Sequence, residues 1–248
     1  MIKTTKRLGS VASRVLTQLR HDHRFVVISL VFPLAIIYFI KIAFDALASP
    51  QFNISIYIIP YAAFIVHFIT FILTAIVLVR ERVAGTLSRM FVSGYNQIEI
   101  IGGYLFGYTT LATAQSLIVL FELNWLFELG YEFQIWAQLF VVMWFLAVLS
   151  MALGMLVSNF ARNEGQVFPF IPLVVLSVIL AGIIIPIEKL PEWAQILSFM
   201  TPLYYANELL QELIRGNNLT DNLQMIFYLF IYGSILLVLV TLTLREKD

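Results

Sequence analysis

Long stretches of apolar residues, separated by short polar segments, form the main pattern of this chain. Six of these stretches reach the roughly 20 residues that a helix needs to cross a bilayer. They cover Phe25–Phe44, Ile54–Val79, Ile100–Leu126, Phe133–Val157, Val167–Ile187 and Leu223–Leu244. The pattern therefore predicts an all-α integral membrane protein, in which six transmembrane helices form one domain over residues 1–248.

The segment before the first span, residues 1–24, has the period of an amphipathic helix. Its apolar positions follow helical spacing, at Leu8, Val11, Val15 and Leu19. Arg7, Arg14 and Arg20 are interleaved with them. We therefore expect an interfacial helix on the cytoplasmic membrane face, where its basic residues suit anionic headgroups of membrane lipid. A contact with a protein partner fits the same pattern.

The segment between the second and third spans, residues 80–97, is not uniformly polar as a simple connector would be. Its apolar residues recur at positions i, i+3 and i+4 of a helix, at Leu87, Met90 and Phe91. Thr86 can cap the start of this helix and Gly94 can end it. A short helix is predicted, which lies either on lipid headgroups or against a partner.

The longest segment outside the spans, residues 188–222, lies between the fifth and sixth. A structureless loop of this length is uncommon in a compact protein. Pro191 can occupy a first helical turn before Glu192–Met200, and Pro202 breaks the chain before helical spacing resumes over Tyr204–Arg215. We expect two short external helices that dip into the outer leaflet and gate or cover an external opening.

Composition supports a membrane protein. Apolar residues make up 60% of the chain and charged residues 12%, with a mean hydropathy of +0.90, whereas a soluble domain carries about 25% charged residues. Fifteen basic residues balance fifteen acidic ones, so no nucleic-acid partner is expected. The absence of cysteine excludes disulfides, thiolate metal sites and a cysteine nucleophile.

The basic residues are divided unequally between the two sides that six spans define. Twelve of the fifteen fall on the side of the termini: Lys3, Lys6, Arg7, Arg14, Arg20, Arg24, Arg80, Arg82, Arg89, Arg162, Arg245 and Lys247. Lys41, Lys189 and Arg215 fall on the other. Because basic loops are retained in the cytoplasm, this distribution predicts a multi-pass protein with both termini cytoplasmic.

The residue patterns of common enzymes and nucleotide sites are missing. The sequence contains no G-x-x-x-x-G-K-[ST] loop for phosphates, no H-E-x-x-H zinc motif and no G-x-S-x-G nucleophile motif. With only three histidines, a histidine-rich metal site is not expected either. The prediction is that this chain has no catalytic residues and binds no metal or cofactor itself.

Polar residues inside the spans are the remaining candidates for function. His67 lies near the middle of the second span, with Thr70 and Thr74 roughly on the same face, and Gln115 lies near the middle of the third. Polar groups at membrane depth either line a transport pathway or form hydrogen bonds between helices. Both interpretations are open for all four residues.

Two regions resemble one known family. Residues 81–87 read Glu-Arg-Val-Ala-Gly-Thr-Leu, which resembles the cytoplasmic segment Glu-Arg/Glu-x-x-Gly-Thr-Leu of ABC-2 type transporter permeases. The second region resembles the closing part of that family, at Arg162–Gln166, Leu180–Gly182, Pro186, Leu190–Trp193, Pro202–Tyr205 and Arg215–Gly216. The usual Ser-Gly before the external proline is Ala181-Gly182 here. With the predicted topology, the resemblance covers essentially the whole chain.

This resemblance implies a transport subunit of an ATP-driven exporter rather than an enzyme. ATP and magnesium would bind to a separate ATP-binding subunit, and the permease would form a dimer with a second copy or a related chain. The location would be the cytoplasmic membrane of a prokaryote, and transport would follow alternating access. The aromatic, sparsely charged spans favour a small amphiphilic cargo, such as a drug, an antibiotic or a lipid-like molecule, over a polysaccharide.

The resemblance also suggests roles for individual residues. The coupling helix that docks on the ATPase would include Glu81, Arg82, Gly85, Thr86, Leu87, Met90 and Phe91. The second and fifth spans would line the pathway. The candidate pathway residues remain the polar residues named above, His67, Thr70 and Thr74 in the second span and Gln115 in the third. The external gate would include Pro186, Pro191, Trp193, Pro202 and Tyr204.

Two other functions compete with this one. A secondary transporter or channel could use His67 and Glu122 as a proton or ion relay, and it would work in liposomes without an ATPase. An immunity or scaffold protein would bind partners in the membrane but would give no substrate-stimulated ATP hydrolysis.

Overall fold

The computed structural model describes residues 2–47 and 54–244, and each regular element in these ranges is a helix. The α-helices are α1 (Ile2–His21), α2 (His23–Leu47), α3 (Ser55–Val83), α4 (Thr86–Val92), α5 (Gln97–Phe127), α6 (Phe133–Phe160), α7 (Ile171–Leu180), α8 (Glu192–Ser198), α9 (Pro202–Ile214) and α10 (Leu223–Thr243). The 3-10 helices are η1 (Glu164–Phe170), η2 (Ile187–Lys189) and η3 (Leu219–Asn222). The all-α fold expected from the apolar pattern is confirmed.

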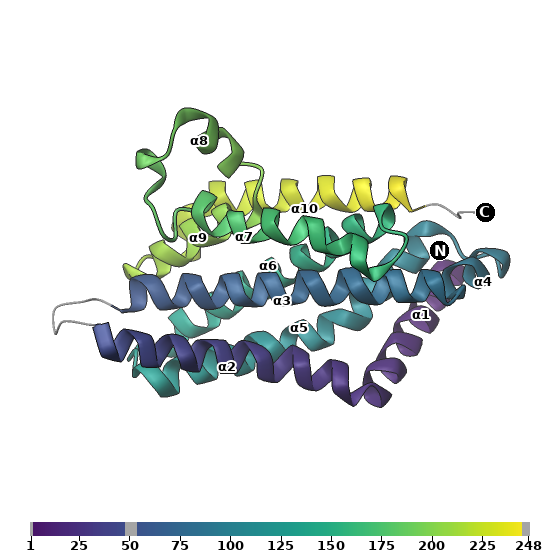
Figure 1. Ribbon diagram of the computed structural model, residues 1–248, viewed down its shortest axis with the longest axis horizontal. Helices are drawn as coiled ribbons and strands as arrows, with labels where there is room; N and C mark the ends of the chain where they lie inside the picture. The colour runs from purple at the N-terminus through teal and green to yellow at the C-terminus, as the bar shows by residue number, and fades with distance from the viewer. Residues whose placement is uncertain (1, 48–53, 245–248) are drawn as a thin grey trace.

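Five helices in the described ranges are long and apolar enough to cross a membrane, and these are α2, α3, α5, α6 and α10. They run alongside one another in Figure 1, and α6 is central because it packs against α3, α5, α9 and α10. The short helices α8 and α9 lie at one end of the bundle, whereas α1 and α4 lie at the opposite end (Figure 1).

The predicted span Val167–Ile187 is not a single long helix. The chain forms η1 and then α7, which ends at Leu180, and Gly182 then has a φ of 78° in the turn that follows. Pro169 lies inside η1 and Pro172 lies in the first turn of α7. Because proline lacks a backbone donor and clashes with the carbonyl four residues earlier, these two prolines disfavour a continuous α-helix here.

Despite this break, η1 and α7 together approach the thickness of a membrane. Seven 3-10 residues and ten α-helical residues have a combined helical length of about 29 Å, close to the roughly 30 Å of a hydrocarbon core. The first helix, α1, and the last turn of α10 lie at the same end of the bundle (Figure 1), which requires an even number of passages. Six spans therefore remain the prediction, with η1 and α7 as the irregular one.

The N-terminal helix α1 lies across the end of the bundle, at a steep angle to the long helices (Figure 1). Its apolar side is packed against α5, where Val11 and Val15 are buried. A Cβ atom added at Gly103 would lie 2.4 Å from the Cβ of Val11, and one at Gly107 would lie 2.6 Å from the Cγ1 of Val15. The face expected to contact lipid is thus covered by protein, while a position of α1 at the membrane surface stays a prediction.

A stripe of small residues brings α6 close to α3. A Cβ atom at Gly154 would lie 2.6 Å from the carbonyl oxygen of Phe71 and 3.0 Å from the backbone nitrogen of Ala75. Ser150 and Ser158, four residues to either side, are also fully buried. Small residues at this four-residue spacing allow the two helix backbones to pack closely.

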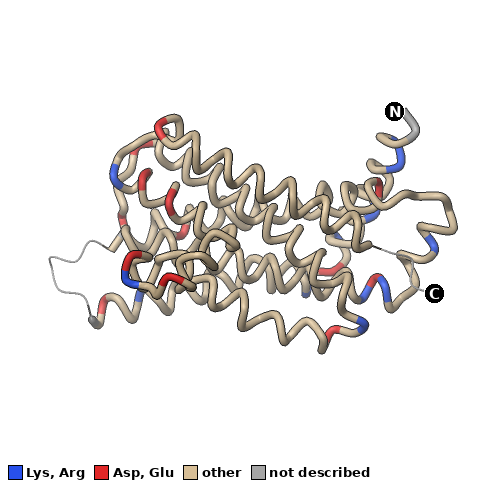
Figure 2. The backbone as a smooth tube through the Cα atoms, turned by 90° about the horizontal axis from the view of Figure 1, so that it is seen from above, with Lys and Arg blue, Asp and Glu red and all other residues tan. Residues whose placement is uncertain are grey.

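Charged side chains are gathered toward the two ends of the bundle. Figure 2 shows Lys, Arg, Asp and Glu there, with long stretches of uncharged residues between them. Many apolar side chains on the long helices are exposed, including Phe39, Phe106 and Phe121. An uncharged band with an apolar surface is the pattern of a membrane-embedded protein.

Candidate functional site

The short helix predicted after the second span is present as α4, and glycines define its two ends. Gly85 is the N-cap with a φ of 69°, and Gly94 follows the C-cap with a φ of 81°, both in the left-handed region that favours glycine. Thr86 is therefore the first residue of α4, and the expectation that its side chain caps the helix is wrong. The stop at Gly94 is as predicted.

The apolar side of α4 faces the protein itself. Leu87 and Met90 are buried in the main hydrophobic core, and Phe91 packs against that core. The side that faces outward, which we call the outer face of α4, is made by the exposed residues Ala84, Arg89, Val92 and Ser93. Val92 is 83% exposed. The outer face is therefore the exposed side of α4, while Leu87 and Met90 hold the helix in place.

Glu81, at the end of α3, is buried and joins α1 to α3. Nη1 of Arg14 lies 3.0 Å from Oε2 of Glu81 and donates a hydrogen bond to it. Arg14 also donates to the hydroxyl of Tyr104 on α5. Burial alone would lower the pKa of Arg14, but the Tyr104 hydroxyl and the Glu81 carboxylate raise it above its ordinary value. Sequence reasoning did not identify Arg14 as a member of this site.

A second ion pair connects α1 to the start of α5. Nη1 of Arg7 lies 3.6 Å from Oε2 of Glu99, and it also donates to the carbonyl of Gly94. Glu99 is fixed by a reciprocal capping box with Asn96. The sequence carried two signals for this arrangement: Arg7 and Arg14 lie seven residues apart, on one face of a helix, and Asn96-x-x-Glu99 matches a capping box.

Arg82 connects the end of α3 to the C-terminal ends of α6 and α10. Its guanidinium donates to the carbonyl of Ser158, to the carbonyl of Ala161 at 3.0 Å and to Oδ1 of Asn159 at 3.0 Å. Asn159 in turn donates to the carbonyl of Val240 on α10 at 3.2 Å. Arg82 thereby adds side-chain donors at the end of α6, where the carbonyl of Ser158 also accepts from the backbone N–H of Ala161 at 3.2 Å. The candidate coupling residues Glu81 and Arg82 are therefore internal anchors.

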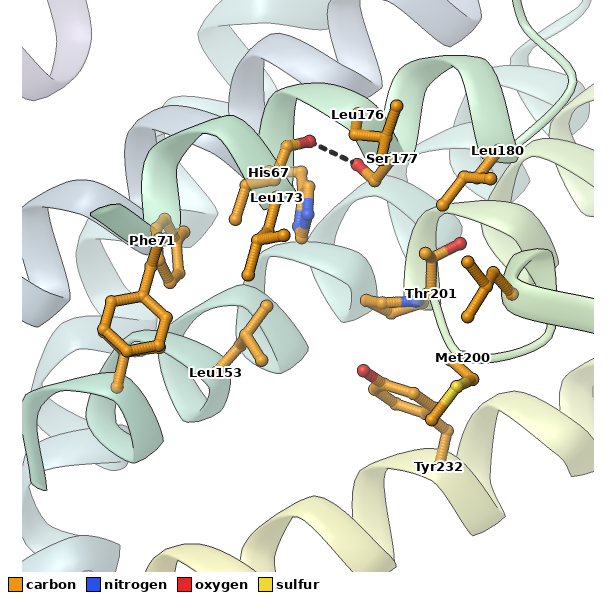
Figure 3. Close-up of a pocket in the computed structure, with 15 residues that line it drawn as sticks. His67, Phe71, Leu153, Leu173, Leu176, Ser177, Leu180, Met200, Thr201 and Tyr232 are labelled. Atoms are coloured by element: carbon orange, nitrogen blue, oxygen red, sulfur yellow. Dashed lines mark hydrogen bonds between the residues drawn. The ribbon is translucent and has the colours of Figure 1, made fainter. Parts of the chain in front are cut away.

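A cavity of about 360 Å3 lies among α3, α6, α7, α10 and the turn after α8. Figure 3 shows His67, Thr201 and Tyr232 around it, together with apolar side chains such as Leu153 and Leu173. Ser177 contributes a hydroxyl, which donates to the carbonyl of Val174 at 2.6 Å. The lining is thus mostly apolar with a few separated polar groups, which is typical of small-molecule sites.

His67 has a defined hydrogen-bond role at the wall of this cavity. Its Nδ1 lies 2.6 Å from the hydroxyl of Ser150, and that hydroxyl donates its proton to the carbonyl of Leu146 at 2.6 Å. Since the serine proton is already used, we assign the donor role in the first bond to Nδ1–H of His67. Nε2 of the neutral ring is then an acceptor.

The other three candidate pathway residues lie around a different and much smaller space. Thr70, Thr74 and Gln115 line a cavity of about 10 Å3 between α2, α3 and α5. Thr70 donates to Oε1 of Gln115 at 2.9 Å. The common face expected for His67, Thr70 and Thr74 is therefore divided between two cavities, and Gln115 is linked to Thr70 rather than to His67.

The segment between α7 and α10 contains the two helices predicted for it, α8 and α9, and η2 precedes them. Pro191 is the N-cap of α8, and Pro202 is the first residue of α9. Trp193 is 64% exposed and Tyr204 is half-buried. Pro186 is the exposed N-cap of η2. Of these candidate gate residues, Pro202 also lines the cavity of His67, whereas Pro186 lines a separate pocket.

Comparison with known proteins shows which family has this architecture. The family model of the ABC-2 type transporter matches residues 7–215. The chain belongs to the ABC-2 type transporter family. The resemblance drawn from residues 81–87 and the closing region is thereby confirmed, and the family and the five long apolar helices support a multi-pass membrane protein.

Two curated relatives agree with this assignment. ABC transporter G family member 20 of Dictyostelium discoideum is 26% identical over 187 residues, which is 71% of this chain and 24% of that protein. The probable multidrug ABC transporter permease YbhR of Escherichia coli (strain K12) is 24% identical over 143 residues, which is 57% of this chain and 39% of that protein. The chain therefore spans less than half the length of either relative.

Proposed function

We propose that this ABC-2 type transporter subunit exports a small amphiphilic molecule by alternating access, driven by ATP hydrolysis on an ATP-binding partner. One observation carries the proposal: α3 runs from the wall of the His67 cavity to the anchors of α4. His67 and Glu81 are separated by about 21 Å along a continuous helix. A movement imposed on α4 would thus be transmitted to the cavity through α3.

The docking surface for the partner is the outer face of α4. Because Leu87 and Met90 fix α4 to the core, and the Arg14–Glu81 and Arg7–Glu99 pairs fix α1 beside it, a force on the outer face moves these helices together. ATP and Mg2+ belong to the partner in this scheme. The partner acts from the cytoplasmic side, with both termini of the chain on that side of a prokaryotic cytoplasmic membrane.

The cargo chemistry follows from the lining of the His67 cavity. Its apolar walls favour a molecule with a large apolar body, and Nε2 of His67 favours a cargo that carries a hydrogen-bond donor. A volume of about 360 Å3 suits a small molecule rather than a polysaccharide. The name of the relative YbhR, a probable multidrug permease, supports a cargo of this kind.

The remaining elements of the transporter complete this scheme. A second copy of the chain, or a related permease, would pack along the half-exposed stripe of α3, at Tyr61, Phe64, Phe68 and Ile72. The helices α8 and α9, with Pro186, Pro191, Trp193, Pro202 and Tyr204, would close the outer opening of the pathway. Membrane lipid surrounds the exposed apolar band.

The test is gentle affinity purification of the tagged protein from native membranes, followed by reconstitution of what co-purifies in liposomes. We expect recovery of an ATP-binding subunit or domain and ATP hydrolysis that rises on addition of rhodamine 6G, a cationic amphiphile with N–H donors. Transport by this chain alone under a pH gradient, without ATP, would instead establish a secondary transporter. Binding of partners without any stimulated ATP hydrolysis would establish a scaffold.

A further inference from the structure

A second cavity of about 360 Å3 lies where α1 meets α2 and α5, away from the His67 cavity and the outer face of α4. Figure 1 shows this place at the elbow between α1 and α2. The walls of the groove are apolar and come from all three helices, through Leu16, Val27, Leu30 and Leu111. Leu16 and Val27 are 39% and 54% exposed, so the groove opens on the outside of the bundle.

The mouth of this groove is basic. Arg20 and His23 form part of its lining, and Arg24 is exposed one residue further along. In the part of the chain that the structure describes, no carboxylate forms an ion pair with Arg20 or Arg24. The neighbouring Asp22 accepts a hydrogen bond from the backbone of Phe25 at 3.0 Å and so caps the start of α2. Two guanidinium groups are thus left available beside an apolar groove.

We propose that this groove binds one anionic phospholipid, with the phosphate at Arg20, His23 and Arg24 and an acyl chain between α2 and α5. The position suits such a ligand because α2 enters the membrane at His23, so the basic mouth lies at headgroup level. From His23 to Leu30 the groove extends about 10 Å toward the bilayer centre. Charge at the mouth and apolar walls below it match the two parts of a phospholipid.

This site rests on the membrane topology proposed above, in which α1 is on the cytoplasmic side. The bound lipid would fix the C-terminal end of α1 against α2 and α5, while the Arg14–Glu81 pair fixes its middle. A lipid in the groove therefore stabilises the packing of α1 against α2 and α5, and α1 in turn supports α4. Loss of the lipid would weaken the attachment of α1 without removing the outer face of α4 or the His67 cavity.

The experiment is native mass spectrometry of the detergent-purified full chain with phosphatidylglycerol or phosphatidylcholine of identical acyl chains. We expect the chain to retain phosphatidylglycerol preferentially, by about fivefold for each arginine at the mouth. The variant Arg20→Gln with Arg24→Gln should lose that preference. Ala114→Phe, which places a ring in the groove, should lower the retention of both lipids. Lys6→Gln with Arg162→Gln removes two exposed basic residues elsewhere and should change neither.

Three results would overturn the site. Unchanged lipid retention in both groove variants would show that lipid binds elsewhere. Retention of both lipids at equal levels, lost only in Ala114→Phe, would show a groove without selectivity for anionic headgroups. Displacement of the lipid by glycerol 3-phosphate would show a phosphate site that needs no acyl chain. The lipid-binding measurement requires neither ATP hydrolysis nor cargo. Each of these results therefore leaves the test of ATP-driven export unaffected.

Discussion

Arg14 of α1 and Glu81 of α3 form an ion pair with an Nη1–Oε2 distance of 3.0 Å, although 67 positions separate them in the chain. The side chain of Glu81 is only 7% exposed, whereas that of Arg14 is 35% exposed. Together with the Arg7–Glu99 pair and the apolar contacts with α5, this pair fixes the N-terminal helix against the bundle. It makes α1 part of the same mechanical unit as α3 and α4.

Removal of one partner of this pair should destabilise the protein measurably. Arg14→Gln leaves the buried carboxylate of Glu81 without its cation, at an expected cost of about 2 kcal/mol, below the 3–5 kcal/mol of fully buried pairs because Arg14 is partly solvated. The apparent melting temperature of the detergent-solubilised protein checks this. Arg80→Gln is the matched control, because the Arg80–Glu164 pair is exposed and contributes about 1 kcal/mol or less. Equal shifts for the two variants would contradict the structural role of Arg14.

The contact between α1 and α5 should depend on glycine at positions 103 and 107. Gly103→Val would overlap with Val11, because even a Cβ atom there lies 2.4 Å from its neighbour. We expect a loss of about 1–3 kcal/mol and easier proteolysis of α1. Gly9→Ala is the control on α1 itself, since a Cβ atom there meets nothing within 4 Å. That change should be neutral or stabilise the helix by up to about 1 kcal/mol. A similar loss of stability in both variants would refute the assigned contact.

The spans of the fold could be predicted because membrane helices depend on long apolar stretches that a sequence shows directly. In the predicted span Val167–Ile187, hydropathy shows only the apolar length, whereas the break between η1 and α7 follows from Pro169 and Pro172, which lack backbone donors. Short helices marked by proline and glycine, such as α9 with Pro202 and Gly216, were located correctly for the same local reasons.

The candidate site was predicted less completely, because side-chain partners are set by contacts between distant segments. The period of Leu87, Met90 and Phe91 correctly indicated an apolar side of α4, but periodicity does not say whether that side meets a partner or the core of the same chain. Likewise, His67 and Thr74 share a helical face, yet the packing of α5, α6 and α7 places them at different cavities.

The outer face of α4 can be tested separately from its buried side. Val92→Asp adds a charge at an exposed position, so we expect normal expression and stability with loss of cargo-stimulated ATP hydrolysis in the reconstituted complex. Leu87→Asp places a charge in the core and should reduce the yield of folded protein instead. Size-exclusion chromatography and the ATPase assay distinguish the two effects. Normal stimulated hydrolysis by Val92→Asp would exclude this surface from coupling.

If cargo binds in the His67 cavity, a larger side chain in the cavity wall should weaken that binding. Leu176→Trp enlarges a side chain that lines the cavity, so the apparent affinity for rhodamine 6G should fall by about tenfold or more through lost apolar contact. Leu239→Trp on α10 is the matched control, because Leu239 is 43% exposed and Leu176 41%, but only Leu176 lines the cavity. Concentration dependence of stimulated ATP hydrolysis measures both. If Leu176→Trp binds the dye as the control does while His67→Leu also leaves binding unchanged, the cargo must bind outside this cavity.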